Sequence, residues 1–432
     1  MTAHVLSDLR IALIGAGPAG LAAARALSQR GLPFTGFERH DEVGGLWDIA
    51  SPWSAVYASA HLISSARRTE FAEWPMPAGT PDYPGHALLL DYLKTYAEQF
   101  DLRRHYRFGV EVVSATRASS GGWTLQFGDG SSECFSHLIT ATGTFSKPLW
   151  PKIPGRFDGQ LSHSAQYKQA SLFAGKRVLI VGAGNSACDI AVDAVHHAAS
   201  VDWSLRRGVH FVPKFIMGKP ADTLGGALKL PAALKQKLDG LLLKFLIGDP
   251  SQLGLPKPDH RLYESHPVVN SLVLHHVGHG DIRVRRAPSR FDGSTVHFAD
   301  GEQAEYDLVL MATGFTLDFG FLPRETFAWN GDCPQLYLNT FHPSANDIFV
   351  LGMVEATGIG WEGRARQAML VAAAIEARVQ QRPGVAGFDA ARATGANLSG
   401  GFKYLPLQRM AFYVHRDTFL KVVERHIRQL AA

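Results

Sequence analysis

The sequence predicts an α/β fold built around two parallel sheets, and three observations carry this prediction. A strand at residues 11–14 runs into a glycine-rich turn, a helical stretch and a second strand at residues 34–38. The same order of strand, glycine turn, helix and strand returns between residues 177 and 205. Each half later closes on a similar phrase, at residues 139–143 and 310–314, so the halves look like divergent copies of one architecture. We therefore expect two dinucleotide-binding, Rossmann-like domains.

The first glycine turn reads Gly15-x-Gly17-x-x-Gly20. Its first glycine makes the tight turn, the second lets a diphosphate approach the backbone, and the third lets the helix pack against the strand. The helix that follows offers free N–H groups to an anion, and Pro18 near its start loses no useful donor. Glu38 ends the second strand, where its carboxylate can accept hydrogen bonds from both ribose hydroxyls and would repel a 2′-phosphate. The first turn therefore favours FAD or NAD(H) over NADP(H).

The second turn reads Gly182-x-Gly184-x-x-Ala187, and alanine is tolerated at the third position. The strand after its helix is followed by Arg206 and Arg207, with no acid where the first copy has one. A guanidinium group donates paired hydrogen bonds to phosphate oxygens and stays charged at any working pH. This half therefore favours NADPH over NADH, and the alternative is that the two arginines are only a solvated strand end.

Short β segments separate the repeated units. We expect them at residues 109–113, 123–127 and 134–140, and again at 282–287, 295–298 and 307–312. The NADPH domain (147–325) would be inserted into the FAD domain (1–146 and 326–432). A segment rich in Leu, Lys and Pro at about 218–260, with an amphipathic stretch at 230–246, would form a helical insertion that could face substrate.

The composition fits a globular protein of two or three domains, since 46% of the 432 residues are hydrophobic. The net charge is +4 and the basic residues are scattered, so we expect no nucleic-acid partner. The three cysteines lie far apart, which fits a reducing compartment such as the cytoplasm. No stretch approaches the ~20 apolar residues that cross a bilayer, so we expect no membrane partner.

One segment resembles a known signature. Residues 157–167 match FxGxxxHxxx(Y/F), which is typical of flavin-containing monooxygenases, a family of class B flavoprotein monooxygenases. Segments 38–47, 83–86, 206–214 and 311–315 resemble the same family, so the resemblance covers nearly the whole chain. Tyr167, rather than Trp, at the last signature position makes the chain look more like a flavin-containing monooxygenase than a Baeyer–Villiger monooxygenase.

The resemblance implies that NADPH reduces FAD and that the reduced flavin captures O2 as a hydroperoxide. The nitrogen of an amine or the sulfur of a sulfide would then attack the outer oxygen. Together with the motifs, the resemblance implies four catalytic residues: Ser64, Ser65, His163 and Tyr167. The cofactor-binding residues are Gly15, Gly17, Pro18, Ala19, Gly20, Glu38, Arg39, Gly45, Leu46, Trp47, His61, Val112, Thr142, Gly143, Gly182, Gly184, Asn185, Ser186, Arg206, Arg207, Thr313, Gly314 and Gln367.

One departure keeps alternatives open. Family members often carry an Asn shortly before the region matching residues 71–77, whereas this chain has Ser64 and Ser65 nearby, whose hydroxyls could substitute. An uncoupled NADPH oxidase or flavin reductase, a Baeyer–Villiger oxidation of ketones and a flavin-binding redox sensor are therefore alternatives. A disulfide reductase is disfavoured because no two cysteines are close in sequence. No metal-binding pattern is present, and a homodimer is expected.

Overall fold

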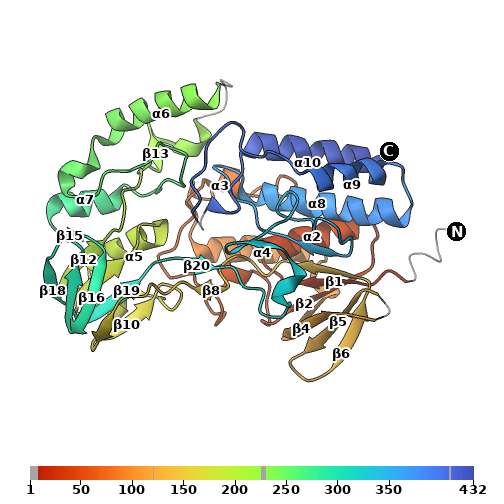
Figure 1. Cartoon of the computed structure of the whole chain (residues 1–432), viewed down its shortest axis with the longest axis horizontal. Coiled ribbons are helices and arrows are strands. Elements are labelled where there is room, and N and C mark those ends of the chain that lie inside the picture. Colours follow the sequence, from red (N-terminus) through yellow and green to blue (C-terminus); the bar gives the residue numbers. More distant parts are fainter. Residues whose placement is uncertain (1–7, 120, 225–229, 408–409) are drawn as a thin grey trace.

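The computed structural model describes residues 8–119, 121–224, 230–407 and 410–432. Two parallel sheets lie side by side along the long axis of the molecule, each with its own helices (Figure 1). The α/β fold with two Rossmann-like sheets that the sequence predicts is thereby confirmed. Within the described residues, no helix combines the length and the apolar character that crossing a membrane would require.

The first sheet draws strands from both ends of the chain. Its order is β23 (Ile348–Val350), β7 (His137–Thr140), β1 (Ile11–Ile14), β2 (Phe34–Glu38) and β3 (Tyr106–Phe108), all parallel. All four residues of the central strand β1 are buried, as expected for a parallel sheet that is covered on both faces. Helix α2 (Pro18–Gln29) packs against α8 (Gly360–Val379), and α8 packs against α10 (Arg416–Ala431).

The second sheet repeats this arrangement within one continuous part of the chain. Its order is β10 (Gln160–His163), β19 (Leu308–Met311), β11 (Arg177–Val181), β12 (Ser200–Ser204) and β15 (Ile282–Arg285), again all parallel. Helix α5 (Asn185–Val195) packs on β11 and β12 and contacts α7 (Leu272–His279).

Smaller sheets flank the two large ones. The antiparallel sheet of the first half contains β4 (Val112–Arg117), β5 (Trp123–Phe127) and β6 (Ser132–Phe135). The second half has β18 (Gln303–Glu305), β17 (Thr295–Phe298), β16 (Pro288–Gly293) and β9 (Gly155–Phe157), in which only β9 joins in parallel. The remaining two-stranded pairs are β13 (Phe215–Ile216) with β14 (Lys219–Pro220) and β21 (Trp329–Asn330) with β22 (Cys333–Pro334).

Further helices complete the described chain. The α-helices are α3 (Ala66–Thr69), α4 (His86–Gln99), α6 (Ala232–Ile247) and α9 (Gly384–Thr394). The 3-10 helices are η1 (Gly45–Trp47), η2 (Arg103–His105), η3 (Ala170–Phe173), η4 (Ala221–Thr223), η5 (Pro250–Leu253) and η6 (Arg324–Thr326).

Two chain segments cross between the halves next to each other. Strand β8 (Lys147–Pro148) leaves the first half and pairs antiparallel with β20 (Phe315–Thr316), which returns from the second. The rings of Phe145 and Phe315 stack beside this pair at 4.8 Å. We propose domain boundaries near residues 146 and 325, because the strands of the second large sheet all lie between these crossings.

The structure corrects several element limits. The strand expected at 109–113 begins only at Val112, and the one expected at 134–140 is divided at Ser136 between two different sheets. The stretch expected to be amphipathic at 230–246 forms helix α6 from Ala232, but its leucines point outward. Periodicity reveals an apolar stripe on a helix and does not reveal which side the rest of the protein covers. Residues 225–229 of the expected insertion lie outside the described residues.

Candidate functional site

The turn between β1 and α2 can be built only with glycine at two positions. Gly15 has φ +105° and donates its N–H to the Phe37 carbonyl at 2.8 Å. A Cβ on Gly15 would lie 2.7 Å from the carbonyl oxygen of Ala141, and one on Gly20 would lie 1.8 Å from that of Gly15. Gly17 precedes the helix and Pro18 begins it, and no side chain caps its first N–H groups. These groups are therefore available to an anion such as a diphosphate.

Glu38 is held at the end of β2 beside this turn. Its carboxylate accepts hydrogen bonds from the backbone N–H of Ala16 at 2.7 Å and of His40 at 2.9 Å. The next residue, Arg39, places its guanidinium 4.2 Å from the centre of the Trp53 ring. Glu38 thus lies where the sequence predicts a ribose-binding acid.

Backbone from the segment after β2 closes over the same turn. Gly45 has φ +56°, and a Cβ on it would lie 2.9 Å from the Cα of Gly17. Leu46 and Trp47 follow in η1, and the Trp47 ring meets Trp361 of α8 edge-on at 6.4 Å. The predicted residues Gly17 and Gly45 are therefore brought together at the N-terminus of α2, while Trp47 contacts α8.

The second glycine turn reproduces several backbone contacts of the first, although Ala187 stands where the first turn has Gly20. Gly182 has φ +144°, donates its N–H to the Ser204 carbonyl at 3.0 Å, and would place a Cβ 2.2 Å from the carbonyl oxygen of Ala312. Ala312 donates to Val181 at 2.7 Å, as Ala141 donates to Ile14 at 2.8 Å. The two similar phrases of the sequence therefore occupy equivalent positions, each pressed against its own glycine turn.

The rim of the second turn carries polar and basic groups. Asn185 is the first residue of α5, and Ser186 follows it. The side-chain oxygen of Asn185 accepts a hydrogen bond from the Val269 N–H at 2.7 Å. Arg207 pairs with Asp259 at 2.6 Å. Arg206 is exposed and forms no ion pair with any described residue. Arg206 is therefore the freer of the two predicted phosphate ligands.

His163 lies buried at the end of β10, between the two halves. Its Nδ1 accepts a hydrogen bond from the Ala165 N–H at 3.1 Å, while Nε2 has no hydrogen-bond partner of ordinary geometry among the described residues. The rings of Trp150 and Phe315 each lie 5.4 Å from it. Burial lowers the pKa of His163, and the nearby backbone of Gly314 opposes that shift in part. A buried, unpartnered nitrogen in this place is suited to receive a polar group of a cofactor.

Comparison with known proteins decides the family. A model described as FMO-like, flavin-binding monooxygenase-like, matches residues 8–382. The chain belongs to this family. It is 32% identical over 317 residues to the probable indole-3-pyruvate monooxygenase YUCCA9 of Arabidopsis thaliana, which covers 70% of this chain and 74% of that protein. It is 29% identical over 375 residues to dimethylaniline monooxygenase (N-oxide-forming) 2 of Oryctolagus cuniculus, which covers 81% and 70%.

A solved structure shares the fold of this monooxygenase. The oxidized steroid monooxygenase bound to NADP has a TM-score of 0.69 and 20% identity, and the match covers 98% of this chain and 97% of that one. The protein is an FAD- and NADPH-dependent monooxygenase, as its family shows. The two glycine turns fit these cofactors, because each leaves bare backbone where a Cβ would collide with a carbonyl.

Tyr167 of the monooxygenase lies inside the second half rather than on an open surface. Its hydroxyl donates to Asp193 at 2.8 Å, and its ring lies 5.5 Å from that of Tyr57. Ser59 donates to the same carboxylate, and the Tyr57 hydroxyl donates to Asp189 at 3.1 Å. Tyr167 thus belongs to a set of contacts that ties the segment around Tyr57 to helix α5.

Ser65 is joined to a residue that sequence reasoning missed. Its backbone N–H donates to the Asp222 carboxylate at 2.7 Å. The Ser65 hydroxyl and the other oxygen of Asp222 are buried without hydrogen-bond partners among the described residues. Ser64, beside it, is partly exposed. Asp222 lies in η4, and no local motif marks it, because the contact spans residues far apart in sequence.

The other predicted ligands are placed as follows. The Nδ1–H of His61 donates a hydrogen bond to the Ser59 carbonyl at 2.7 Å, because a carbonyl oxygen can only accept. Gln367 on α8 accepts from the Gly352 N–H at 3.2 Å, and a Cβ on Gly352 would lie 3.2 Å from that of Ala19. Gln367 therefore holds the Gly352 backbone, which lies next to Ala19 at the start of α2. Val112 is buried in the antiparallel sheet of the first half.

The two crossover phrases hold the remaining predicted residues. Thr142 shares a hydrogen bond of 3.3 Å with Thr140, and Gly143 has φ +80°. Thr313 donates to the Leu149 carbonyl at 2.5 Å, and Gly314 has φ +92°. Their positive φ angles favour glycine, which explains why both phrases end on it.

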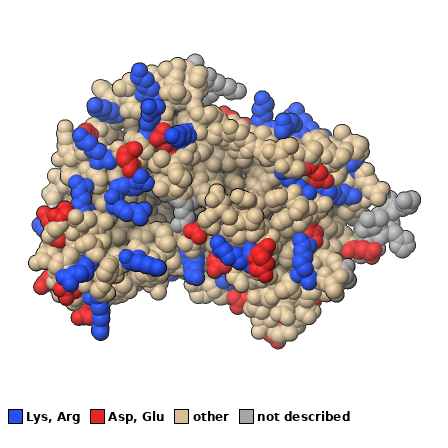
Figure 2. Space-filling model, viewed as in Figure 1, with Lys and Arg blue, Asp and Glu red and all other residues tan. Residues whose placement is uncertain are grey.

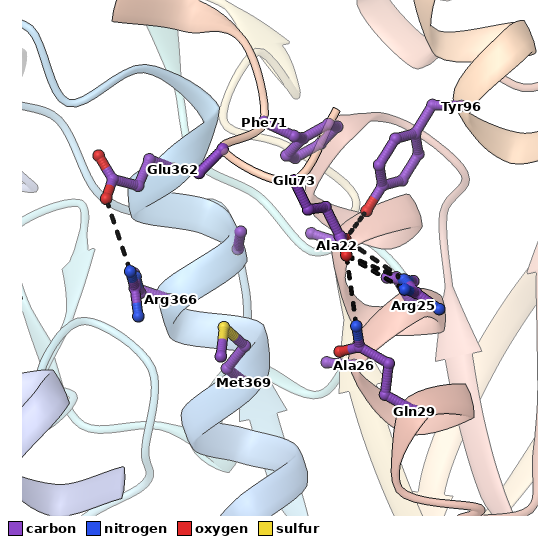
Figure 3. Close-up of a pocket in the computed structure, with 12 residues that line it drawn as sticks. Ala22, Arg25, Ala26, Gln29, Phe71, Glu73, Tyr96, Glu362, Arg366 and Met369 are labelled. Carbon is purple, nitrogen blue, oxygen red and sulfur yellow. Dashed lines mark hydrogen bonds and ion pairs between the residues drawn. The ribbon is translucent and has the colours of Figure 1, made fainter. Parts of the chain in front are cut away.

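A separate pocket of about 220 Å³ lies between α2 and α8 (Figure 3). Its polar groups already satisfy one another, since Glu73 pairs with Arg25 at 3.2 Å and accepts from Tyr96 at 2.8 Å. It lies apart from the N-terminus of α2 and contains none of the predicted site residues. The described part of the chain shows no group of three or more His, Cys, Asp or Glu side chains that could hold a metal ion.

Proposed function

We propose that the protein inserts one oxygen atom of O2 into a small nucleophilic substrate, an amine or a sulfide, at the expense of NADPH. The observation that carries the cofactor assignment is the difference in charge after the second strand of each βαβ unit: the strand register sets Leu205 in the place equivalent to that of Glu38, and two arginines follow Leu205. Glu38 follows the first glycine turn and Arg206 follows the second. A carboxylate suits the ribose hydroxyls of FAD, whereas an exposed guanidinium suits the 2′-phosphate of NADPH.

In this proposal the chain holds, orients and encloses the reactants. When bound, FAD reduced by NADPH supplies the activation of O2. The N-termini of α2 and α5 hold the two diphosphates, while Glu38 and Arg206 fix the register of each dinucleotide. His163 closes the space between the halves, and its neutral Nε2 orients a polar group of the nicotinamide cofactor. A dry enclosure limits the loss of activated oxygen as peroxide.

Ser64 and Ser65 stand near the place where relatives often carry an Asn. We propose that the buried Ser65 hydroxyl, which has no partner among the described residues, donates a hydrogen bond toward the flavin. Tyr167 is then a positioning residue, because its hydroxyl is engaged by Asp193.

The choice of an amine or sulfide rests on Tyr167 at the last signature position. The names of two relatives point to different substrates: one names indole-3-pyruvate, and the other names dimethylaniline with formation of an N-oxide. A Baeyer–Villiger-type oxidation and an uncoupled NADPH oxidase are therefore the alternatives. A disulfide reductase stays disfavoured, because no two of Cys134, Cys188 and Cys333 are close in sequence. The homodimer and the cytoplasmic location remain predictions.

The test is a substrate panel. Purified protein loaded with FAD would be given NADPH, O2 and, in turn, tertiary amines, sulfides, ketones and 2-oxo acids, while NADPH oxidation, peroxide and product are measured. The proposal expects an amine or sulfide to yield oxygenated product with little peroxide. Product only from carbonyl compounds would favour the Baeyer–Villiger alternative, and peroxide equal to NADPH with every compound would favour the oxidase.

A further inference from the structure

Exposed apolar side chains gather in one part of the molecule. Among the described residues, 11 of the 17 large hydrophobic side chains that are exposed lie between Phe215 and Leu272. Single exposed hydrophobic residues are normal on a protein surface, whereas a contiguous group marks a contact surface. The concentration of exposed hydrophobic side chains in this segment therefore indicates a contact surface for a partner.

Helix α6 turns its apolar side outward. Leu234, Leu238, Leu241, Leu242 and Phe245 follow one another at helical spacing, and Phe245 is 86% exposed. No described residue of α6 is buried, although its second half is apolar on nearly every side. The helix lies along the outer edge of the molecule, at the top of the view in Figure 1. Ile247 at its C-terminal end packs against the core of the second half, but the outward leucines and Phe245 do not hold the helix in place.

The polar residues of α6 hold it to the protein instead. Gln236 donates to the Leu262 carbonyl at 2.6 Å. Asp239 accepts from Tyr263 at 2.6 Å and pairs with Lys235 at 2.5 Å. These contacts fix the orientation of the helix, so the outward stripe is a consequence of specific hydrogen bonds rather than of loose packing.

A second apolar projection lies in the same segment. Met217 connects β13 to β14, is 95% exposed, and is followed two residues later by Lys219. Met217 and Phe245 are the two most exposed of the large hydrophobic side chains among the described residues. Both apolar projections therefore come with lysines close by in the chain.

The charged residues near α6 and Met217 indicate which kind of partner could bind this surface. Lys219, Lys237 and Lys244 form no ion pair with any described residue. The acids of the segment each have a partner: Asp239 pairs with Lys235 and Asp259 with Arg207, while Asp249, Asp222 and Glu264 accept from the backbone N–H groups of Ser251, Ser65 and Arg261. Lys and Arg side chains are prominent over this upper edge of the surface (Figure 2). The surface therefore combines exposed apolar side chains with lysines that form no ion pair with a described acid.

A second copy of the chain fits this surface poorly. In a two-fold dimer the same patch meets itself, so the lysines of one copy would face lysines of the other. An anionic bilayer surface provides what the patch lacks, because its headgroups carry negative charge and its acyl boundary accepts Leu, Phe and Met. We propose that residues 215–224 and 232–246 dock this monooxygenase onto the surface of an anionic lipid bilayer, with α6 lying in the interface. This contact needs no spanning helix, and it is proposed as an alternative to the sequence expectation of no membrane partner.

Vesicle binding by the full, FAD-loaded protein tests the proposal. We expect co-sedimentation with vesicles of phosphatidylcholine and phosphatidylglycerol in equal parts, and much weaker binding to phosphatidylcholine alone. Each lysine near such a surface accounts for about a fivefold change in partition, so Lys237→Gln with Lys244→Gln should weaken binding about 25-fold. Leu241→Glu with Phe245→Glu should abolish it. Leu88→Glu with Val113→Glu is the control, since these hydrophobic side chains are also exposed but lie elsewhere.

Retained flavin and an unchanged unfolding midpoint would show that the variants fold. The proposal is overturned if the parent protein ignores anionic vesicles, or if the Leu241→Glu and Phe245→Glu variant binds as the parent does. It is also overturned if the parent is a dimer in solution and this variant a monomer, because a second copy would then cover the stripe. Activity is not part of the readout, so the outcome is independent of the proposed oxygenation.

Discussion

The backbone N–H of Ser65 donates to the Asp222 carboxylate at 2.7 Å and so joins the segment before α3 to the insertion of the second half. Asp222→Ala would leave that N–H buried without an acceptor, which costs about 1–3 kcal/mol. We expect a lower thermal midpoint and more peroxide per NADPH oxidised. Asp222→Asn keeps an acceptor oxygen and should lie between the parent and the alanine variant. Equal behaviour of Asn and Ala would show that the hydrogen bond does not matter.

Arg206 and Arg207 should differ in their effect on cofactor choice. Arg206 has no ion-pair partner among the described residues, whereas Arg207 pairs with Asp259 at 2.6 Å. A charge-assisted hydrogen bond to phosphate is lost in Arg206→Ala, so we expect the KM for NADPH to rise about tenfold or more. The KM for NADH should change little, because NADH has no 2′-phosphate. Arg207→Ala should have the smaller effect, and equal changes for both cofactors would refute the assignment of Arg206.

His163→Ala should uncouple NADPH oxidation from oxygenation. The substitution removes a buried ring between Trp150 and Phe315 and opens the space between the halves to water. We expect a higher ratio of peroxide to NADPH at saturating cofactor. His426→Ala is a suitable control, since His426 is equally buried but lies in α10 against Tyr337. If both variants raised the ratio alike, general loosening of the protein would be the cause.

The state of His163 also predicts a pH dependence of stability. Burial lowers its pKa from the usual value of about 6.5, so at that pH the unfolded chain binds a proton that the folded chain does not. Its contribution is therefore complete above pH ~6.5 and is lost as the pH falls toward the lower folded pKa. We expect the unfolding midpoint to drop between about pH 7.5 and about pH 5.5. The drop should be smaller in His163→Gln, and an identical drop would remove His163 as a contributor.

The repeated βαβ units could be predicted from the sequence because their signals are local. Strand β1, strand β2 and both glycine turns depend on residues within one strand, turn and helix, and the structure confirms their positions. The equivalence of the two crossover phrases was also visible, since each follows the strand that packs against its glycine turn. Of the candidate site, the residues on these turns lie where the sequence placed them.

Contacts between distant segments could not be predicted in this way. The Ser65–Asp222 and Tyr57–Asp189 hydrogen bonds join segments more than a hundred residues apart, and neither partner lies in a motif. The engagement of Arg207 by Asp259 has the same origin. The outward face of α6 depends on hydrogen bonds to the segment around Tyr263, which leave no periodic trace in the sequence.

Gly182 and Gly184 stand two residues apart in the second turn and should fail in different ways when a Cβ is added. A Cβ on Gly182 would lie 2.2 Å from the Ala312 carbonyl oxygen at φ +144°, so Gly182→Ala should destabilise the fold. A Cβ on Gly184 would meet no described atom within 4 Å, so Gly184→Ala should keep the unfolding midpoint. The new methyl group would instead occupy the space through which a diphosphate approaches the backbone.

We therefore expect Gly184→Ala to raise the KM for NADPH and for NADH by similar factors, because both cofactors carry the diphosphate. This pattern differs from that of Arg206→Ala, which should affect NADPH alone. Steady-state kinetics with both cofactors and a thermal melt of each variant check the prediction. An unchanged KM in a stable Gly184→Ala protein would mean that the nicotinamide cofactor does not bind at the N-terminus of α5, and the assignment of the second turn to NADPH would then fall.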